Sequence, residues 1–325
     1  MGKIENVKNY SGKDLETIFF RPMLTGPGAD ELGIRVMYNM PVPTTLHLWK
    51  RSGDILQKYT QAGWNGASSA SKFQKTINMS KVKAEIGYSA DDYFSKVYEL
   101  ITNRPDVNMD DLSGTELEEA ETTLFKESIA ESIRATMWLG KTSRSTGLNT
   151  FDGLLTRIDT DSKLAGTEIA VRSYADIDPD LVEDLIKGAW NAASDSLKAL
   201  KSQGNLVYFV STDVYNAYED HLDSSVLEAA YLAKQEGREG LSYRGVPVVD
   251  LHLSGYASVA SDLPASFIIL TDKRNLALAV NTNDFPGTEV RMWYNPDLME
   301  NRQRAIFMAG ADYLLPELVS YSYLE

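Results

Sequence analysis

A single long amphipathic helix is the strongest structural signal in the sequence. Ser113 with Glu116, and Thr115 with Glu118, have capping-box spacing, which marks a helix start. Charged residues then separate apolar ones that recur at helical spacing, namely Leu117, Leu124, Phe125, Ile129, Ile133 and Met137. The pattern predicts one helix of about seven turns that ends just before Gly140.

The end of this helix also matches a relaxed nucleotide-binding loop. The stretch ATMWLGKT (135–142) has Ala135 in place of the first glycine, and Gly-Lys-Thr closes it. Such a loop needs a buried strand before it and glycines that let backbone amides surround a phosphate. Helical periodicity precedes it here, so we expect residues 135–139 to be helical and Gly140 to stop the helix. Lys141 would then interact with the helix C-terminus. Nucleotide hydrolysis through Lys141 and Thr142 is the competing hypothesis.

The first 90 residues predict an irregular arm followed by extended strands. Up to about Pro43, chain breakers cluster in TGPGADELG (25–33) and MPVP (40–43), and short apolar pieces such as IFF and IRVMY could add strands to another element. Residues 72–90 alternate between apolar and polar, with a change of parity near Ser80 that indicates a bulge or bend. Together with GWNGASSAS before them, they predict a long, partly exposed hairpin rather than part of a core sheet.

The second half of the chain predicts helices followed by strands. Asp178-Pro179 is a helix start signal, and an apolar face runs from Leu181 to Leu200, before Gly204 as the C-terminal cap. The run LVYFV (206–210) is typical of a buried strand, and a short helix is expected over 212–220. After residue 241 the pattern is β-rich. Helices packed with mixed, largely antiparallel strands indicate the α+β fold class.

Composition narrows the classes of function. A chain of 325 residues with 43% apolar content can form one large domain or two ordinary ones. No apolar run approaches about 18 residues, so no membrane-spanning helix is expected. The chain has no cysteine, which removes thiolate metal sites and cysteine nucleophiles and favours a cytoplasmic compartment. Its net charge is −14, from 46 acidic and 32 basic residues, which disfavours tight nucleic-acid binding.

The sequence presents no catalytic, cofactor-binding or metal-ligating set of residues. His47, His221 and His252 lie far apart, which favours ordinary surface or half-buried histidines over metal ligands. Spacing alone leaves a Ser-His-Asp triad open, but no GxSxG motif supports one. The acidic pairs at 91–92, 110–111 and 118–119 point apart on a strand or helix, so solvation or helix-start electrostatics explains them better than carboxylate catalysis.

The order of these features resembles the major capsid proteins of tailed phages, the Hong Kong 97-type family. GWNGASSASKFQKTINMSKVKAEIGYSADDYF (63–94) is similar to that family's extended loop, and FKESIAESIRATMWLGKTSRSTGLNTFDGLL (125–155) to its spine helix and the segment after it. Residues 177–220 look like its axial-domain helix, strand and short helix. YRGVPVVDL (243–251) is similar to its Gly-x-Pro-Val turn, and RAIFMAGADYLLPELVSYSYL at the C-terminal end to its returning strands. The resemblance covers nearly the whole chain and rests on order, since no single stretch is diagnostic.

The resemblance implies an N-terminal arm (1–44), an extended β-hairpin loop (45–88), a peripheral domain with the spine helix (89–150 and 285–325) and an axial domain (151–284). It implies a structural protein, with no enzymatic activity and no cofactor, whose copies form hexamers and pentamers of an icosahedral shell around double-stranded DNA. The arm and loop would reach neighbouring copies and add strands to them. The acidic balance would let the DNA slide inside the shell without sticking.

Further partners and alternatives follow from the same resemblance. Scaffold, portal and decoration proteins are possible partners, and the expected location is the virion capsid, with the host cytoplasm during assembly. No long charged helical segment precedes the arm, so a separate scaffold or none is expected. The Lys and Asn through which some relatives crosslink are not identified here. An encapsulin-type compartment, which has the same fold and encloses enzymes, is the alternative shell.

Overall fold

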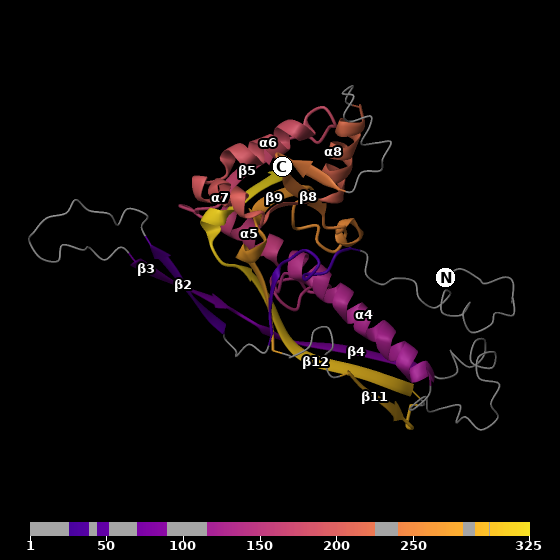
Figure 1. The fold of residues 1–325 in the computed structure, drawn as a ribbon. Coiled ribbons are helices and arrows are strands. Elements are labelled where there is room, and N and C mark those ends of the chain that lie inside the picture. Colours follow the sequence, from indigo (N-terminus) through magenta and orange to yellow (C-terminus); the bar gives the residue numbers. More distant parts are fainter. Residues whose placement is uncertain are drawn as a thin grey trace, which may run out of the picture.

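The computed structural model describes residues 26–38, 44–51, 70–89, 116–224, 240–281, 290–298 and 300–325. Three regions are evident in Figure 1. The compact part is a sheet flanked by helices, the limb is a long helix beside a narrow sheet, and a two-stranded hairpin projects away from both.

The compact part is built on a six-stranded sheet. Its strand order is β5 (Ala170–Tyr174), β13 (Val319–Leu324), β9 (Phe267–Asp272), β6 (Leu206–Val210), β8 (Val246–Asp250) and β7 (Leu241–Tyr243). The β5–β13 and β6–β8 pairs are parallel and the others are antiparallel. Arg244 and Gly245 join β7 to β8 with φ of 54° and 76°, and positive φ at both positions is what a tight type I′ hairpin turn requires.

Both faces of this sheet are buried, and β6 shows why its sequence is continuously apolar. Leu206, Tyr208 and Val210 pack into one core with α6 (Val182–Ala192) and α8 (Thr212–Ser224). Val207 and Phe209 point to the opposite face and pack into a second core with α4 (Glu116–Leu139) and α5 (Leu154–Ser162). Because successive strand residues alternate between faces, a strand between two cores must be apolar at every position.

The limb packs helix α4 along a sheet of long strands. In that sheet β12 (Glu300–Tyr313) pairs antiparallel with β4 (Ser80–Ser89) along one edge and with β11 (Val290–Asn295) along the other. The last five residues of β12 pair with β10 (Leu276–Val280), and β10 pairs in parallel with β1 (Arg35–Met37). The single strand β12 therefore runs from the limb into the compact part.

Several sequence predictions are confirmed. Helix α4 ends at Leu139, and the predicted apolar residues Phe125, Ile129, Ile133 and Met137 are buried. The 206–210 strand forms, the predicted 212–220 helix forms and extends to Ser224, and strands dominate after residue 241. IRVMY does add a strand, β1, although to a sheet of its own chain. The capping residues Ser113 and Thr115 and the IFF piece lie outside the described residues.

Two predictions of local structure were wrong in part. The alternating stretch 72–90 bends near Ser80 as expected, but its two halves belong to different sheets. β3 (Ala70–Ile77) pairs with β2 (Thr44–Arg51) in the hairpin, whereas β4 is a strand of the limb sheet. The second error is the single helix expected from Asp178 to Gly204.

That second helix is three helices in the structure. α6 begins at Val182 and ends at Ala192, α7 covers Asp195–Ala199, and a 3-10 turn covers Leu200–Gln203. Ser194 causes the break, because its side chain accepts a hydrogen bond from the Leu197 amide at 3.1 Å and starts a new helix. Its hydroxyl also donates to the Glu317 carbonyl at 2.6 Å. Gly204 ends the last turn in the left-handed conformation, as predicted.

Candidate functional site

The environment of Lys141 and Thr142 is that of a helix end. Residues 135–139 are helical, as the sequence predicts, so no strand precedes the Gly-Lys-Thr stretch. Lys141 Nζ lies 2.6 Å from Asp262 Oδ2, and Arg144 Nη2 lies 2.5 Å from Oδ1 of the same carboxylate. The Thr142 amide and hydroxyl donate to Asp152 Oδ1 at 2.8 and 2.9 Å. These groups hold the 141–152 loop and the 251–263 segment together.

Lys141 and Arg144 stabilise the ionised form of Asp262. Burial acts to raise the pKa of its carboxyl, but hydrogen bonds from Lys141 and Arg144 outweigh that effect and lower the pKa below its ordinary value. Arg144 also donates to the Leu139 carbonyl at 2.6 Å, which satisfies a carbonyl at the end of α4. Arg144 thus takes the helix-end role that the sequence suggests for Lys141.

Gly140 is required for close packing. It is followed by Lys141 outside the helix, and its φ is not in the left-handed region. A Cβ on Gly140 would lie 2.2 Å from the Phe151 carbonyl oxygen, and one on Gly153 would lie 2.6 Å from the Trp138 carbonyl. The Gly153 amide donates to the Gly140 carbonyl at 2.8 Å, so two backbone segments touch directly. The glycine that resembles a phosphate-binding loop is a packing glycine.

A buried ionic cluster joins the middle of α4 to the compact part. Arg134 Nε and Nη2 each donate to Glu131 at 2.8 Å, and Nη1 donates to the Leu251 carbonyl at 2.7 Å. The Tyr256 hydroxyl donates to Glu131 Oε1 at 2.7 Å. Burial, with the hydrogen bond to Glu131, raises the pKa of Tyr256 to about 12. Sequence reasoning missed this cluster, although the i, i+3 spacing of Glu131 and Arg134 allows an ion pair along one side of the helix.

His221 and His252, whose side chains the structure describes, belong to no metal-binding arrangement of described residues. His252 Nδ1 lies 2.9 Å from Asp250, and His221 Nε2 lies 3.4 Å from Glu183. In the part of the chain that the structure describes, no group of three or more His, Asp or Glu residues could hold a metal ion. The side chain of His47 and the acidic pairs at 91–92, 110–111 and 118–119 lie outside the described residues. Within the described ranges, no helix has the length and apolar character needed to cross a membrane.

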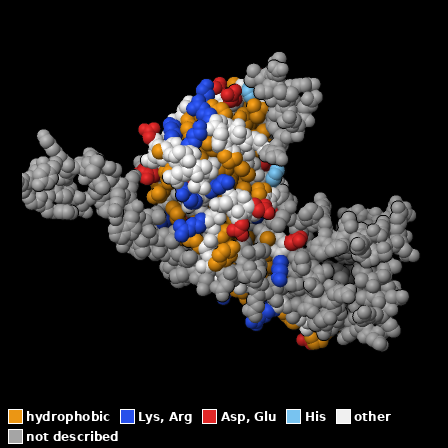
Figure 2. Space-filling model, in the orientation of Figure 1, with side chains coloured by type: hydrophobic (Ala, Val, Ile, Leu, Met, Phe, Trp, Pro, Cys, Tyr) orange, Lys and Arg blue, Asp and Glu red, His pale blue; other side chains and the backbone are white. Residues whose placement is uncertain are grey.

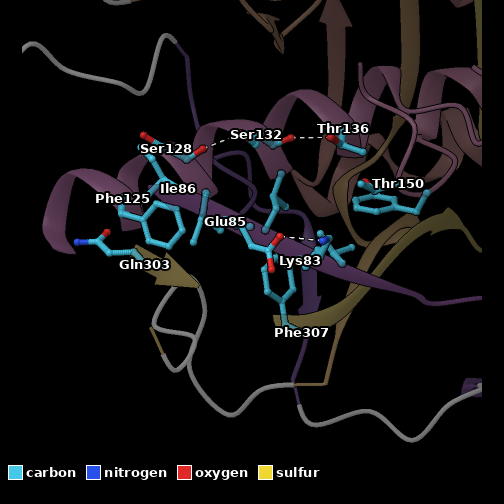
Figure 3. A pocket seen from close by; sticks show the side chains of 15 residues that line it. Lys83, Glu85, Ile86, Phe125, Ser128, Ser132, Thr136, Thr150, Gln303 and Phe307 are labelled. Carbon is cyan, nitrogen blue, oxygen red and sulfur yellow. Dashed lines mark hydrogen bonds and ion pairs between the residues drawn. The ribbon is translucent and has the colours of Figure 1, made fainter. Parts of the chain in front are cut away.

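A groove of about 590 Å³ runs between α4 and the limb sheet. Figure 3 shows Phe125, Ile86 and Phe307 along it, with Lys83 and Glu85 paired at 2.7 Å beside it. The hydroxyls of Ser132 and Thr136 donate to the Ser128 and Ser132 carbonyls of their own helix, at 2.8 and 2.6 Å (Figure 3). Since its helix hydroxyls are already bonded and its walls are largely apolar, the groove is suited to packing rather than to catalysis.

The limb sheet has one covered face and one open face. Along β12 the odd-numbered residues 301–309 are buried, whereas Arg304 and Ile306 are exposed. The register places basic side chains together on the open face, and these are Lys81, Lys83, Arg291, Arg302 and Arg304. Glu85 pairs with Arg304 at 2.7 Å, and Arg304 also lies over the Trp293 ring. By contrast, basic and acidic groups are scattered over the compact part in Figure 2. An exposed basic face with Trp293 and Ile306 is suited to contact with another macromolecule.

Solved structures with the same arrangement of elements are known. No family model matches the sequence, and no curated protein matches it. A chain in the structure of the satellite phage P4 procapsid including size determination (Sid) protein has a TM-score of 0.57 and 10% identity, covering 98% of this chain and 93% of that chain. A capsid chain of the empty GTA particle has a TM-score of 0.55 and 14% identity, with coverages of 100% and 94%. A chain in the structure of the capsid of Myoviridae phage XM1 has a TM-score of 0.51 and 12% identity, covering 90% of this chain and 90% of that chain.

The chain has the fold of phage and GTA capsid chains. The match spans nearly all of both chains in each of these comparisons, so it includes the limb and hairpin as well as the compact part. Identities of 10–14% mean that the likeness lies in the fold and not in shared residues. The mixed helix-and-strand class predicted from the sequence is confirmed.

Proposed function

We propose that this chain is the major capsid protein of a tailed phage or prophage. Its copies assemble through hexamers and pentamers into an icosahedral shell around double-stranded DNA, in the Hong Kong 97-type manner. It acts as a structural protein and not as an enzyme, in the virion capsid after assembly in the host cytoplasm. The observation that carries the proposal is the capsid fold over 98% of this chain and 93% of the P4 procapsid chain.

Each of the three regions corresponds, in this proposal, to a different part of the capsid subunit. In this proposal the hairpin belongs to the extended loop (45–88), and α4 with the C-terminal strands belongs to the peripheral domain (89–150 and 285–325). The compact part belongs to the axial domain (151–284), and residues 1–44 form the arm. The open face of the limb and the projecting hairpin are exposed elements of the kind that neighbouring copies cover.

The charge of the chain is consistent with a container for DNA. A net charge of −14 leaves few phosphates neutralised, so packaged DNA would not be immobilised on the inner wall. Scaffold, portal and decoration proteins are further partners in this proposal. An encapsulin-type shell would have the same fold, and its contents would distinguish it.

Nucleotide hydrolysis through Lys141 and Thr142 has no geometric support. The helix before Gly140 and the Lys141–Asp262 ion pair leave neither the strand nor the phosphate-facing lysine that such a loop needs. Equilibrium dialysis with ATP should therefore detect no binding to the purified chain. Binding that disappears in Lys141→Ala would contradict the helix-end assignment.

Negative-stain microscopy of the purified chain, alone and with its gene neighbours, tests the capsid proposal. Rings of five or six subunits, or closed shells, are the expected products. Particles purified from an infected or induced host should contain double-stranded DNA, whereas an encapsulin-type shell should contain a protein cargo. A chain that stays monomeric alone and beside a co-expressed scaffold and portal would contradict the proposal.

A further inference from the structure

The base of the projecting hairpin touches the rest of the chain through alternate residues of one segment. Gln74 and Thr76 are exposed, whereas Lys75 is half-buried and Ile77 and Met79 are buried. Ile77 and Met79 pack in a small core with Met37, Ala277, Ala279 and Leu314. Beyond this base, β2 and β3 extend away from both the limb and the compact part (Figure 1). Among the described residues, Lys75, Ile77 and Met79 therefore join the base of the hairpin to the rest of the chain.

Lys75 makes a polar contact at this base. Its Nζ lies 3.2 Å from Asp312 Oδ1 and 4.7 Å from the centre of the Tyr313 ring. Asp312 lies on β12, and its side chain is 2% exposed. Lys75 is on β3, so this ion pair connects the hairpin to the strand shared by the limb and the compact part.

The other groups around Asp312 come from α5 and from its own strand. Arg157 Nη1 lies 3.4 Å from Asp312 Oδ2, and the Tyr313 amide donates to Oδ1 at 2.9 Å. The Tyr313 hydroxyl donates to Asp161 of α5. Arg157 holds one carboxylate oxygen from the compact part, while Lys75 approaches the other from the hairpin.

We infer that Lys75 is a positioning residue, whose contacts with Asp312 and Tyr313 fix the direction in which the β2–β3 hairpin projects. The apolar contacts of Ile77 and Met79 hold the base, but apolar packing is non-directional. A charge-assisted contact to a buried carboxylate adds a directional constraint to this packing. The inference deepens the proposed function and rests on it, because a projecting loop must meet its neighbour at a defined place.

The length of the hairpin makes this orientation matter. Eight residues of β-strand span about 26 Å at roughly 3.3 Å per residue. A rotation of about 10° at the base would then displace the far end by about 5 Å. A displacement of that size would separate hydrogen-bonding partners on another copy, since those bonds require about 3 Å.

The charge state of Asp312 gives the inference a distinctive pH dependence. Burial raises the pKa of Asp312 above its ordinary value of 3.8, and Arg157 and Lys75 oppose that effect without cancelling it. As the pH falls, Asp312 is therefore protonated in the folded chain before it would be in the unfolded chain. Through this group, folding is favoured below the ordinary pKa, and that contribution is lost as pH rises through the folded pKa. Acid should thus release Lys75 without unfolding the chain through Asp312.

Distance measurements between two spin labels on the unassembled chain test the inference. The chain has no cysteine, so Arg51→Cys in the hairpin and Ser202→Cys in the compact part give two specific labels. The labelled wild-type background should give one narrow distance distribution at neutral pH. Lys75→Met and Asp312→Asn should each broaden it by about 5 Å, the displacement expected for a rotation at the base.

Controls separate orientation from folding. Lys75→Arg keeps the cation and should keep the distribution narrow, and Lys83→Met, which removes an exposed cation of the limb, should leave it unchanged. Acid that protonates Asp312 should broaden the wild-type distribution but should not further broaden that of Asp312→Asn. Equal widths for Lys75→Met and wild type, or a wild-type width that does not respond to acid, would overturn the inference. Because the measurement uses unassembled chains, its outcome is independent of whether shells form.

Discussion

The compact part and the limb bury their sheets differently. The compact sheet has helices or other elements on both faces, and every residue of β6 and β9 is buried. The limb sheet has α4 on one face, and its β12 strand alternates between buried and exposed residues. The compact part should therefore contribute most of the folding stability, while the limb keeps a face and an edge available for other molecules.

The largest expected difference in unfolding free energy is between variants of one buried and one exposed apolar side chain. Trp138 is fully buried, with its ring centre 5.2 Å from that of Phe209, so Trp138→Ala should lower the free energy of unfolding by about 3–5 kcal/mol. Ile306 on the open limb face is 48% exposed, and Ile306→Ala should change it by less than about 0.5 kcal/mol. Urea denaturation of unassembled chains measures both, and equal losses would contradict the contrast.

The buried ionic cluster should be almost as sensitive as the core. Arg134→Met leaves Glu131 without its buried cation and should cost about 3–5 kcal/mol of unfolding free energy. The double variant Arg134→Met with Glu131→Gln removes both charges and should be more stable than Arg134→Met alone. If the double variant were the less stable one in the same denaturation assay, desolvation of Glu131 would not be the cause.

A smaller effect is expected at the contact between α4 and the 141–153 loop. Gly140→Ala would place a methyl group 2.2 Å from the Phe151 carbonyl oxygen, so the backbone must shift. We expect this shift to lower the free energy of unfolding by about 1–3 kcal/mol. Gly255→Ala is the matched control, because its Cβ would have open space. Thermal unfolding should separate the two variants, and a shared melting temperature would show that the loop moves freely.

The smallest effect on folding is expected on the open face of the limb. Arg304→Gln removes an exposed ion pair with Glu85 and a contact with the Trp293 ring, so the urea midpoint of the unassembled chain should hardly change. If this face binds another copy, the same variant should alter the salt dependence of assembly, followed by light scattering. A large shift of the urea midpoint would show that the face stabilises the monomer instead.

Local sequence patterns correctly predicted the elements in which the spacing of apolar residues shows which residues are buried. The apolar spacing before Gly140 predicted α4 to its last residue, and LVYFV predicted a strand buried on both faces. The same reasoning placed β3 and β4 in one hairpin, because alternation describes a strand without naming its partner. It also ran α6 through Ser194, since an interior serine and an N-cap serine are identical until the Leu197 amide and Glu317 carbonyl are in place.

The contacts of Lys75 and Arg134 were harder to predict from the sequence. Lys75 and Asp312 are separated by more than two hundred positions in the sequence and lie in two different sheets. Nothing in the residues next to them marks them as partners. The i, i+3 spacing of Glu131 and Arg134 was visible in the sequence, but the hydrogen bond from Arg134 to the Leu251 carbonyl was not.

Amino-acid sequence was enough to predict the types of element, the absence of cysteine chemistry, the acidic balance and an order of elements that resembles a phage capsid protein. Periodicity and composition carry these properties because they depend on each residue's own preference for water or for a core. Only tertiary packing established which strands pair, why Gly140 must be glycine, and where Lys75 meets Asp312 and Arg134 meets the Leu251 carbonyl. Those contacts join residues far apart in the chain, and their distances exist only after the two cores have formed.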